Sequence, residues 1–164
     1  DAKPNKAHLK LAEMERAGKL SAIVTQNIDG LHQAAGSKNV FELHGSVHRN
    51  YCQKCGKFFD VNYVVNAKGV PYCDECGGII KPDVVLYEEG LDSQTINGAV
   101  RAISKADMLI IGGTSLVVYP AAGMIDYFKG KYLAVLNRDA TSRDKQADLC
   151  ITDPIGEVLG RIRV

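Results

Sequence analysis

The stretch CQKCGKFFDVNYVVNAKGVPYCDEC, from Cys52 to Cys76, holds two Cys-x-x-Cys pairs separated by seventeen residues. Four thiolates at this spacing match the pattern for one tetrahedral structural zinc ion. The segment has too little apolar sequence to fold alone, and zinc binding can supply on the order of 10 kcal/mol to such a unit. Four thiolates leave no coordination position for a substrate, so the predicted role is structural. Two disulfides are the alternative interpretation.

Composition limits the classes of protein to which the chain can belong. Its 164 residues are enough for one compact domain, or one domain with a small insert. A net charge of +1 argues against a nucleic-acid or membrane role driven by bulk charge. No run approaches the length of a membrane span, and no secretory signal is visible. Paired cysteines in an α/β chain fit metal binding in a reducing compartment, so we expect a cytoplasmic protein in which Cys150 is a small buried apolar residue.

Outside the cysteine segment, short apolar strands alternate with amphipathic helices. Helices are expected between Pro4 and Gly18, over 31–35, 92–105 and 120–129, and after Pro154; strands are expected over 20–25, 40–43, 84–87, 107–111, 132–136 and 148–151. Such alternation predicts a Rossmann-like α/β fold, with a mostly parallel sheet covered by helices on both faces. We expect a zinc-ribbon domain at 47–82, inserted between the two parts of the Rossmann-like domain at 1–46 and 83–164.

Small polar groups follow four of the expected strands, where ligands bind in open parallel sheets. They are Gln26-Asn27-Ile28-Asp29, His44, Gly113-Thr114-Ser115 and Asn137. Each has a simpler explanation when taken alone: a helix cap, a structural histidine or an ordinary turn. Gly112-Gly113-Thr114-Ser115 also lacks both the GxGxxG spacing and the lysine of a P-loop. Together the four strand ends predict a nucleotide site, in which His44 is suited to act as a general base.

In combination these residues resemble the sirtuins, the NAD-dependent protein lysine deacylases, in their bacterial form. The matching segments, in the family's order, are Thr25–His32, Leu43-His44-Gly45-Ser46, the four cysteines, Lys81–Val85, Gly113–Leu116 and Leu136-Asn137. They cover almost the whole chain, and the match is highly specific.

The resemblance implies a site residue by residue. His44 is then the general base, assisted by Asn27 and Asp29, which lie closest to the reacting part of NAD. The implied NAD-binding residues are Gln26, Asn27, Ile28, Asp29, His44, Gly113, Thr114, Ser115, Asn137, Arg138, Asp139 and Ile155. The implied ligands of one structural Zn²⁺ are Cys52, Cys55, Cys73 and Cys76.

The resemblance also implies an acyl-lysine peptide or protein as substrate, bound as an added strand. The residues flanking it would be Val84, Val85, Tyr87, Leu91, Val117, Val118 and Tyr119. In the family's reaction the acyl oxygen attacks the ribose as nicotinamide leaves, and the acyl group ends on ADP-ribose.

Two departures from the family pattern stand out. The family's first strand, its Gly-Ala-Gly-Ile-Ser loop and its Pro-Asp-Phe-Arg segment have no match, so roughly the first third of a typical catalytic core is absent. We therefore expect these 164 residues alone to be poorly active or inactive. The second departure is Glu88, where many relatives have glycine, which is expected to alter the peptide groove.

Three other functions compete with deacylation. Some relatives perform mono-ADP-ribosyl transfer with the same cofactor pocket, and product identity separates the two reactions. A zinc-ribbon binding module without chemistry is the second, although the ribbon lacks a basic, aromatic-rich face suited to nucleic acid. Oxidoreduction on a generic dinucleotide fold is the third, but no catalytic Tyr/Lys pair can be placed.

Overall fold

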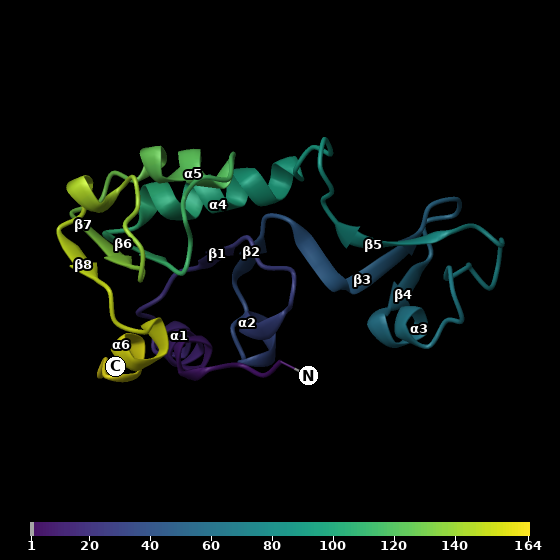
Figure 1. Cartoon of the computed structure of the whole chain (residues 1–164), viewed down its shortest axis with the longest axis horizontal. Helices are drawn as coiled ribbons and strands as arrows, with labels where there is room; N and C mark the ends of the chain where they lie inside the picture. The colour runs from purple at the N-terminus through teal and green to yellow at the C-terminus, as the bar shows by residue number, and fades with distance from the viewer. Residues whose placement is uncertain (1) are drawn as a thin grey trace. The chain divides into compact units, whose positions relative to one another are not determined.

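The computed structural model describes residues 2–164, which form two compact units (Figure 1). The first unit comprises the chain up to Val24, Leu31–Phe41 and Asp92–Val164, and the second comprises Thr25–Gly30 and Glu42–Leu91. The zinc ribbon expected at 47–82 lies wholly within the second unit, and its exact boundaries stay a prediction. Within residues 2–164, no helix combines the length and the apolar character needed to cross a membrane.

The first unit contains the parallel sheet. Its strands are β6 (Met108–Gly112), β7 (Tyr132–Leu136) and β8 (Leu149–Ile151), and its helices are α1 (Lys6–Arg16), α2 (Leu31–Ala34), α4 (Ser93–Lys105), α5 (Ala121–Met124), η1 (Ile125–Tyr127), η2 (Asp144–Gln146) and α6 (Ile155–Gly160). The sheet order is β6-β7-β8, with both pairs parallel. Two short strands, β1 (Ile23–Thr25) and β2 (Val40–Glu42), pair with each other and contribute residues to both units.

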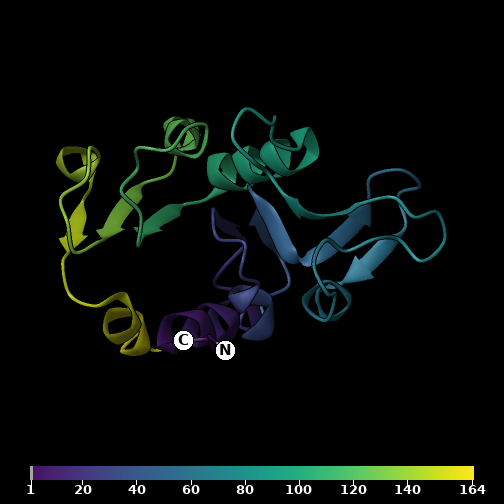
Figure 2. The same ribbon diagram turned by 45° about the vertical axis from the view of Figure 1, so that its right-hand side comes forward.

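Helices cover both faces of this sheet, as predicted. Ala134 and Leu136 of β7 pack against α1 and α6, which lie side by side in Figures 1 and 2. Leu133 and Val135 point to the opposite face and pack against the segment around η1, which contacts α4. Because successive strand residues alternate between faces, a strand that is apolar at every position must be buried on both sides. The apolar run of β7 therefore determines the layered arrangement of this unit.

The second unit is an antiparallel sheet with the cysteine ribbon at one end. Its elements are β3 (Gly45–Cys52), β4 (Phe58–Asp60), α3 (Val61–Val65) and β5 (Ile80–Val84), and the strand order is β4-β3-β5. Phe59 and Ile80 form a small core with two of the cysteines, Cys52 and Cys73. A core of this size agrees with a unit that needs metal for stability.

Three sequence-based expectations are wrong. The strand expected at 84–87 ends at Val84, since only Ile80–Val84 pairs with β3. The helix expected over 120–129 is broken into the short helices α5 and η1, because Pro120 supplies no side-chain cap and Gly123 is a poor helix former. Cys150 is exposed rather than buried, because β8 is an edge strand of the three-stranded sheet.

Candidate functional site

The four predicted zinc ligands form one cluster at the end of the second unit. All four sulfur atoms lie within 4.8 Å of one another, with 3.4 Å between Cys52 and Cys76 Sγ and 3.7 Å between Cys55 and Cys73 Sγ. Tetrahedral Zn–S bonds of about 2.3 Å would separate the sulfurs by about 3.8 Å, so the cluster fits the ion. A disulfide requires about 2.05 Å, which rules out the alternative pairing for these thiols.

Tight turns of the backbone bring the sulfurs together. The N–H of Gly56 donates to the Cys52 carbonyl (2.9 Å), and the N–H of Gly77 donates to the Cys73 carbonyl (3.0 Å). Backbone N–H groups of Cys55 and Lys54 also lower the pKa of the Cys52 thiol to about 6. Because the thiolate is the form that binds metal, these turns favour the metal-binding form of Cys52. The pKa values of Cys55 and Cys76 are raised instead, since the backbone N–H groups of Lys57 and Gly78 are outweighed by the neighbouring thiols and by burial.

In the same unit, His44 and the loop 26–30 are held together by a ring-to-backbone hydrogen bond. Nδ1 of His44 lies 3.0 Å from the carbonyl oxygen of Gln26. A carbonyl only accepts hydrogen bonds, so Nδ1 carries the proton and Nε2 is the nitrogen able to accept one. Within the loop, the Asn27 N–H donates to Thr25 Oγ1 (3.1 Å), and Asn27 Nδ2 lies 3.5 Å from Asp29 Oδ2. The predicted residues 26–29 and His44 are therefore brought together.

Backbone constraints fix the orientation of His44. Gly45 has φ +76°, and a Cβ added there would lie 1.8 Å from the Asp83 carbonyl oxygen. From the same segment, the N–H of Val85 donates to the His44 carbonyl (3.1 Å). Only glycine allows β5 to approach the backbone so closely at this position. This contact explains why glycine follows the histidine in the His-Gly-Ser motif.

A charged cluster that was not predicted joins residues on either side of His44 in the sequence. Arg49 of β3 donates through Nη1 to Glu42 Oε2 (2.6 Å) and through Nε to Asp83 Oδ2 (2.8 Å). Burial disfavours the charged guanidinium, but the two carboxylates outweigh it and raise the pKa of Arg49. The pairs connect β2, β3 and β5; His44 lies between β2 and β3 in the chain, and β5 pairs with β3.

The first unit brings together a second set of predicted residues at the carboxyl edge of its sheet. Gly112 ends β6 opposite Leu136 of β7, and the N–H of Gly113 donates to the Leu136 carbonyl (3.2 Å). Asn137 follows β7, and its Nδ2 donates to the Asp139 carbonyl (2.9 Å). Ile155 at the start of α6 packs so closely on Gly112 that a Cβ there would lie 2.4 Å from Ile155 Cδ1.

The geometry at this edge suits a nucleotide. Gly113 has φ +61° with open space where a side chain would stand, so a phosphate or ribose can approach its backbone. Thr114 Oγ1 accepts from the Leu116 N–H (3.2 Å) and shapes the turn. Ser115, Arg138 and Asp139 lie in the loops that follow β6 and β7.

The residues predicted to flank the substrate divide between the units and are largely exposed. In the second unit, Val84 ends β5, the N–H of Val85 donates a hydrogen bond to the His44 carbonyl, and Tyr87 is fully exposed. Glu88 adopts φ +71°, an uncommon conformation for a residue other than glycine. Leu91 follows this turn, and Val117, Val118 and Tyr119 are exposed in the first unit.

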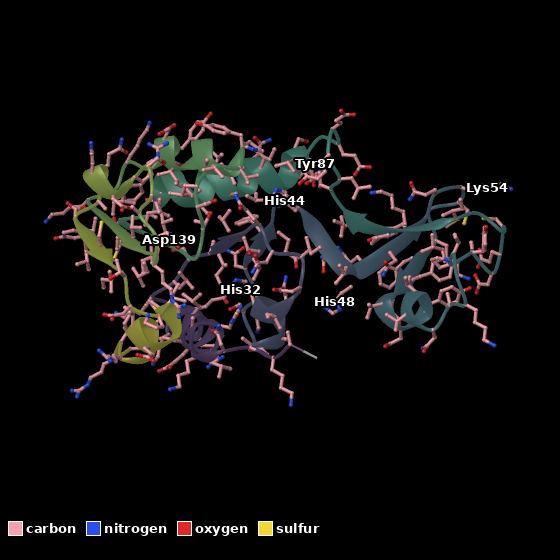
Figure 3. All side chains as sticks on the ribbon, in the orientation of Figure 1. His32, His44, His48, Lys54, Tyr87 and Asp139 are labelled. Carbon is pink, nitrogen blue, oxygen red and sulfur yellow. The ribbon has the colours of Figure 1, made fainter. Side chains whose placement is uncertain are left out.

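A second histidine also contacts the loop 26–30. Nε2 of His48 lies 3.0 Å from the Asp29 carbonyl oxygen. Figure 3 labels His44 and His48 in the part of the second unit where β3 begins, while Lys54 lies at its opposite end. No role was predicted for His48, because no local pattern indicates a contact between residues nineteen positions apart.

Comparison with known proteins agrees with this geometry. The model of the Sir2 family matches residues 1–120, most of the chain. The chain belongs to the Sir2 family.

Among Sir2 relatives, the NAD-dependent protein deacetylase of Clostridium acetobutylicum is 67% identical over 160 residues, which are 97% of this chain and 65% of that protein. The NAD-dependent protein deacetylase of Clostridium perfringens is 65% identical and is matched over 99% of this chain and 67% of its own length. The chain thus spans about two thirds of the length of these curated relatives.

Solved Sir2 structures share the fold. One described as "Sir2-p53 peptide-NAD+" is 41% identical, with a TM-score of 0.90, over 98% of this chain and 69% of that one. Another, "Sir2 bound to acetylated peptide", is 40% identical, with a TM-score of 0.89, over 98% of this chain and 70% of that one. The sirtuin resemblance and the predicted fold class are therefore confirmed.

Proposed function

We propose that the full-length protein carrying this chain is an NAD-dependent protein lysine deacylase, with acetyl-lysine as its first candidate substrate. Relatives named NAD-dependent protein deacetylase, 67% and 65% identical, support this function over the alternatives. The main structural support is the hydrogen bond between His44 Nδ1 and the Gln26 carbonyl, because it leaves Nε2 of His44 able to accept a proton.

Each unit carries its own share of the predicted NAD-binding residues. NAD, when bound, supplies the ADP-ribosyl group that accepts the acyl group, with nicotinamide as the leaving group. In the second unit, Gln26, Asn27, Ile28 and Asp29 would bind the nicotinamide and its ribose. In the first unit, the positive-φ turn at Gly113 with Thr114 and Ser115 would bind phosphate and ribose. Asn137, Arg138, Asp139 and Ile155 would bind the adenosine.

His44 would take the proton of a ribose hydroxyl at Nε2 and hold it there. The Gln26 carbonyl keeps the imidazole in the required tautomer and partly compensates the positive charge that develops. Asn27 and Asp29 would orient the reacting ribose. The acyl-lysine peptide would contact Val84, Val85, Tyr87 and Leu91 of the second unit, and Val117, Val118 and Tyr119 of the first.

One zinc ion on the four cysteines would stabilise the second unit without entering the reaction, since four thiolates close its coordination shell. Four thiols in a metal site rather than in disulfides fit a reducing compartment, so we place the protein in the cytoplasm.

The test is mass spectrometry of an acetyl-lysine peptide incubated with the full-length protein, with and without NAD. We expect NAD-dependent loss of the acetyl group, together with formation of acetylated ADP-ribose. His44→Ala should lower the rate by about 10²- to 10⁴-fold, the usual contribution of a general base. His8→Ala, in α1 of the first unit, serves as the histidine control: it removes a capping contact with Asn5 and a ring contact with His32, and should retain activity.

The alternatives give different products. A gain of ADP-ribose on a protein, with the acetyl group retained, would select mono-ADP-ribosyl transfer. An unchanged peptide across acetyl and longer acyl groups, with no consumption of NAD, would reject both reactions and favour a binding module. Retained activity in His44→Ala would reject His44 as the base.

A further inference from the structure

Three carbonyl groups of the loop 26–30 accept hydrogen bonds from one short segment, residues 44–48. The Gln26 carbonyl accepts from His44 Nδ1 (3.0 Å), and the Ile28 carbonyl accepts from the Val47 N–H (3.1 Å). The Asp29 carbonyl accepts from His48 Nε2 (3.0 Å). All of these groups belong to the second unit. The loop is thus held at both ends by histidine side chains and in the middle by backbone.

His48 also packs directly on Gly30, the last residue of the loop. Gly30 has φ +67°, and a Cβ added there would lie 2.6 Å from His48 Cδ2 and 3.0 Å from His48 Nε2. The imidazole therefore occupies the space that a side chain at position 30 would need. The hydrogen bond to Asp29 and the contact with Gly30 are two different interactions, and both fix the same end of the loop.

We propose that His48 is a positioning residue: it holds the Asp29–Gly30 end of the loop so that Asn27 and Asp29 meet the reacting ribose in a productive geometry. This inference rests on the proposed function, because it takes the loop to bind the nicotinamide half of NAD. Small displacements of positioning groups are costly in enzymes, since reacting atoms must be held close to their final geometry.

The chemistry of the bond makes a specific demand on the side chain. A carbonyl only accepts, so Nε2 of His48 must carry a proton, and it carries that proton in both the neutral tautomer and the imidazolium. Facing the ring are the Asp29 carbonyl and Gly30, while Ser46 Oγ accepts from the His48 backbone N–H (3.2 Å). A glutamine side chain can place an N–H at a similar position, whereas leucine cannot.

The first test compares His48→Leu with His48→Gln in the full-length protein. We expect His48→Leu to lower kcat about fivefold, in keeping with loss of one neutral hydrogen bond, while the KM for the acetyl-lysine peptide stays unchanged. Affinity for ADP-ribose, which lacks nicotinamide, should also stay unchanged. His48→Gln should recover kcat to within about twofold of wild type. The limbs of the kcat profile against pH should keep their wild-type positions in both variants.

A second measurement needs neither NAD nor activity. Amide hydrogen exchange of the segment 25–31 in the NAD-free protein should become faster in His48→Leu and remain near the wild-type rate in His48→Gln. Lys68→Leu, which places the same side chain at another exposed position of the unit, is the matched control and should change neither exchange nor kcat.

The outcomes separate the two proposals. Two results would overturn the role of His48. One is unchanged hydrogen exchange over 25–31 in His48→Leu. The other is an equal loss of kcat in His48→Leu and His48→Gln when both variants melt at the wild-type temperature. If hydrogen exchange in the variants changes as expected but the wild-type protein removes no acyl group, the proposed function is overturned, and with it the kinetic part of this inference. Faster exchange with unchanged kcat would show that His48 holds the loop without positioning the ribose, which also overturns it.

Discussion

At the scale of single residues, two positions with positive φ show different kinds of constraint. Gly45 has no room for a Cβ, since the Asp83 carbonyl oxygen lies 1.8 Å from where it would be. Glu88 adopts φ +71° on an exposed turn, where an L-residue pays about 1–2 kcal/mol for the left-handed conformation. The first position is set by contact between backbones, so no other residue fits. The second carries the backbone cost of the left-handed conformation on an exposed turn, which a glutamate can adopt.

Gly45→Ala should therefore be severely destabilising. The methyl group would push β5 away from β3 next to His44, and we expect the free energy of unfolding to fall by at least about 3 kcal/mol, with loss of activity. Urea denaturation of the full-length protein measures the change.

Gly69→Ala is the control for this change. Gly69 also has positive φ (+91°), but nothing lies within 4 Å of an added Cβ, so only the backbone strain of about 1–2 kcal/mol applies. Equal losses in the two variants would mean that the contact with Asp83 does not matter.

At the scale of helices and strands, the sequence predicted best where the signals are local. The start of α4 follows from Asp92, whose carboxylate accepts from the Thr95 N–H (2.7 Å), and the apolar run of β7 identifies a strand buried on both faces. Strand β3 was not predicted, because its residues Gly45–Cys52 show no clean alternation and its pairing with β5 joins residues 28 to 39 positions apart. For the same reason the contacts of His48 and Arg49 were not predicted, since their partners are distant in sequence.

One contact at this scale gives a pH-dependent prediction. Glu15 in α1 accepts from the N–H groups of Asn39 (2.7 Å) and Lys38 (2.9 Å), the residues that lead into β2. The Asn39 bond, followed by the Lys38 bond, lowers the pKa of Glu15 below its ordinary value of 4.5. A lowered pKa in the folded state stabilises the protein fully above pH 4.5, and this contribution is lost as the pH falls through the folded-state value.

We therefore expect Glu15→Gln to flatten the dependence of stability on pH. At pH 7 the variant should lose about 1 kcal/mol, at the low end for charged hydrogen bonds because the carboxylate is accessible to water. Below about pH 4 the difference from wild type should shrink. Thermal unfolding measured between pH 3 and 8 tests this expectation, and a constant difference across that range would contradict it.

At the scale of the whole molecule, each compact unit has its own core. The first is built on β6, β7 and β8 with helices on both faces, and the second has a small core in which two cysteines take part. An ion pair network adds little to the second unit, since Lys57, Asp74 and Glu75 are solvent-accessible. Its stability must therefore depend on the metal far more than that of the first unit.

Removing zinc should consequently unfold the ribbon while the parallel sheet stays folded. The protein should contain one zinc per chain, and chelation should increase amide hydrogen exchange over 45–84 but leave β6, β7 and β8 protected, because the lost binding free energy is on the order of 10 kcal/mol. Cys55→Ala should reproduce the effect of chelation. Cys150→Ala should keep one zinc, since Cys150 lies outside the cluster. Uniform loss of protection across both units would show that the zinc ribbon supports the whole molecule, and unchanged protection over 45–84 would show that its small core suffices without metal.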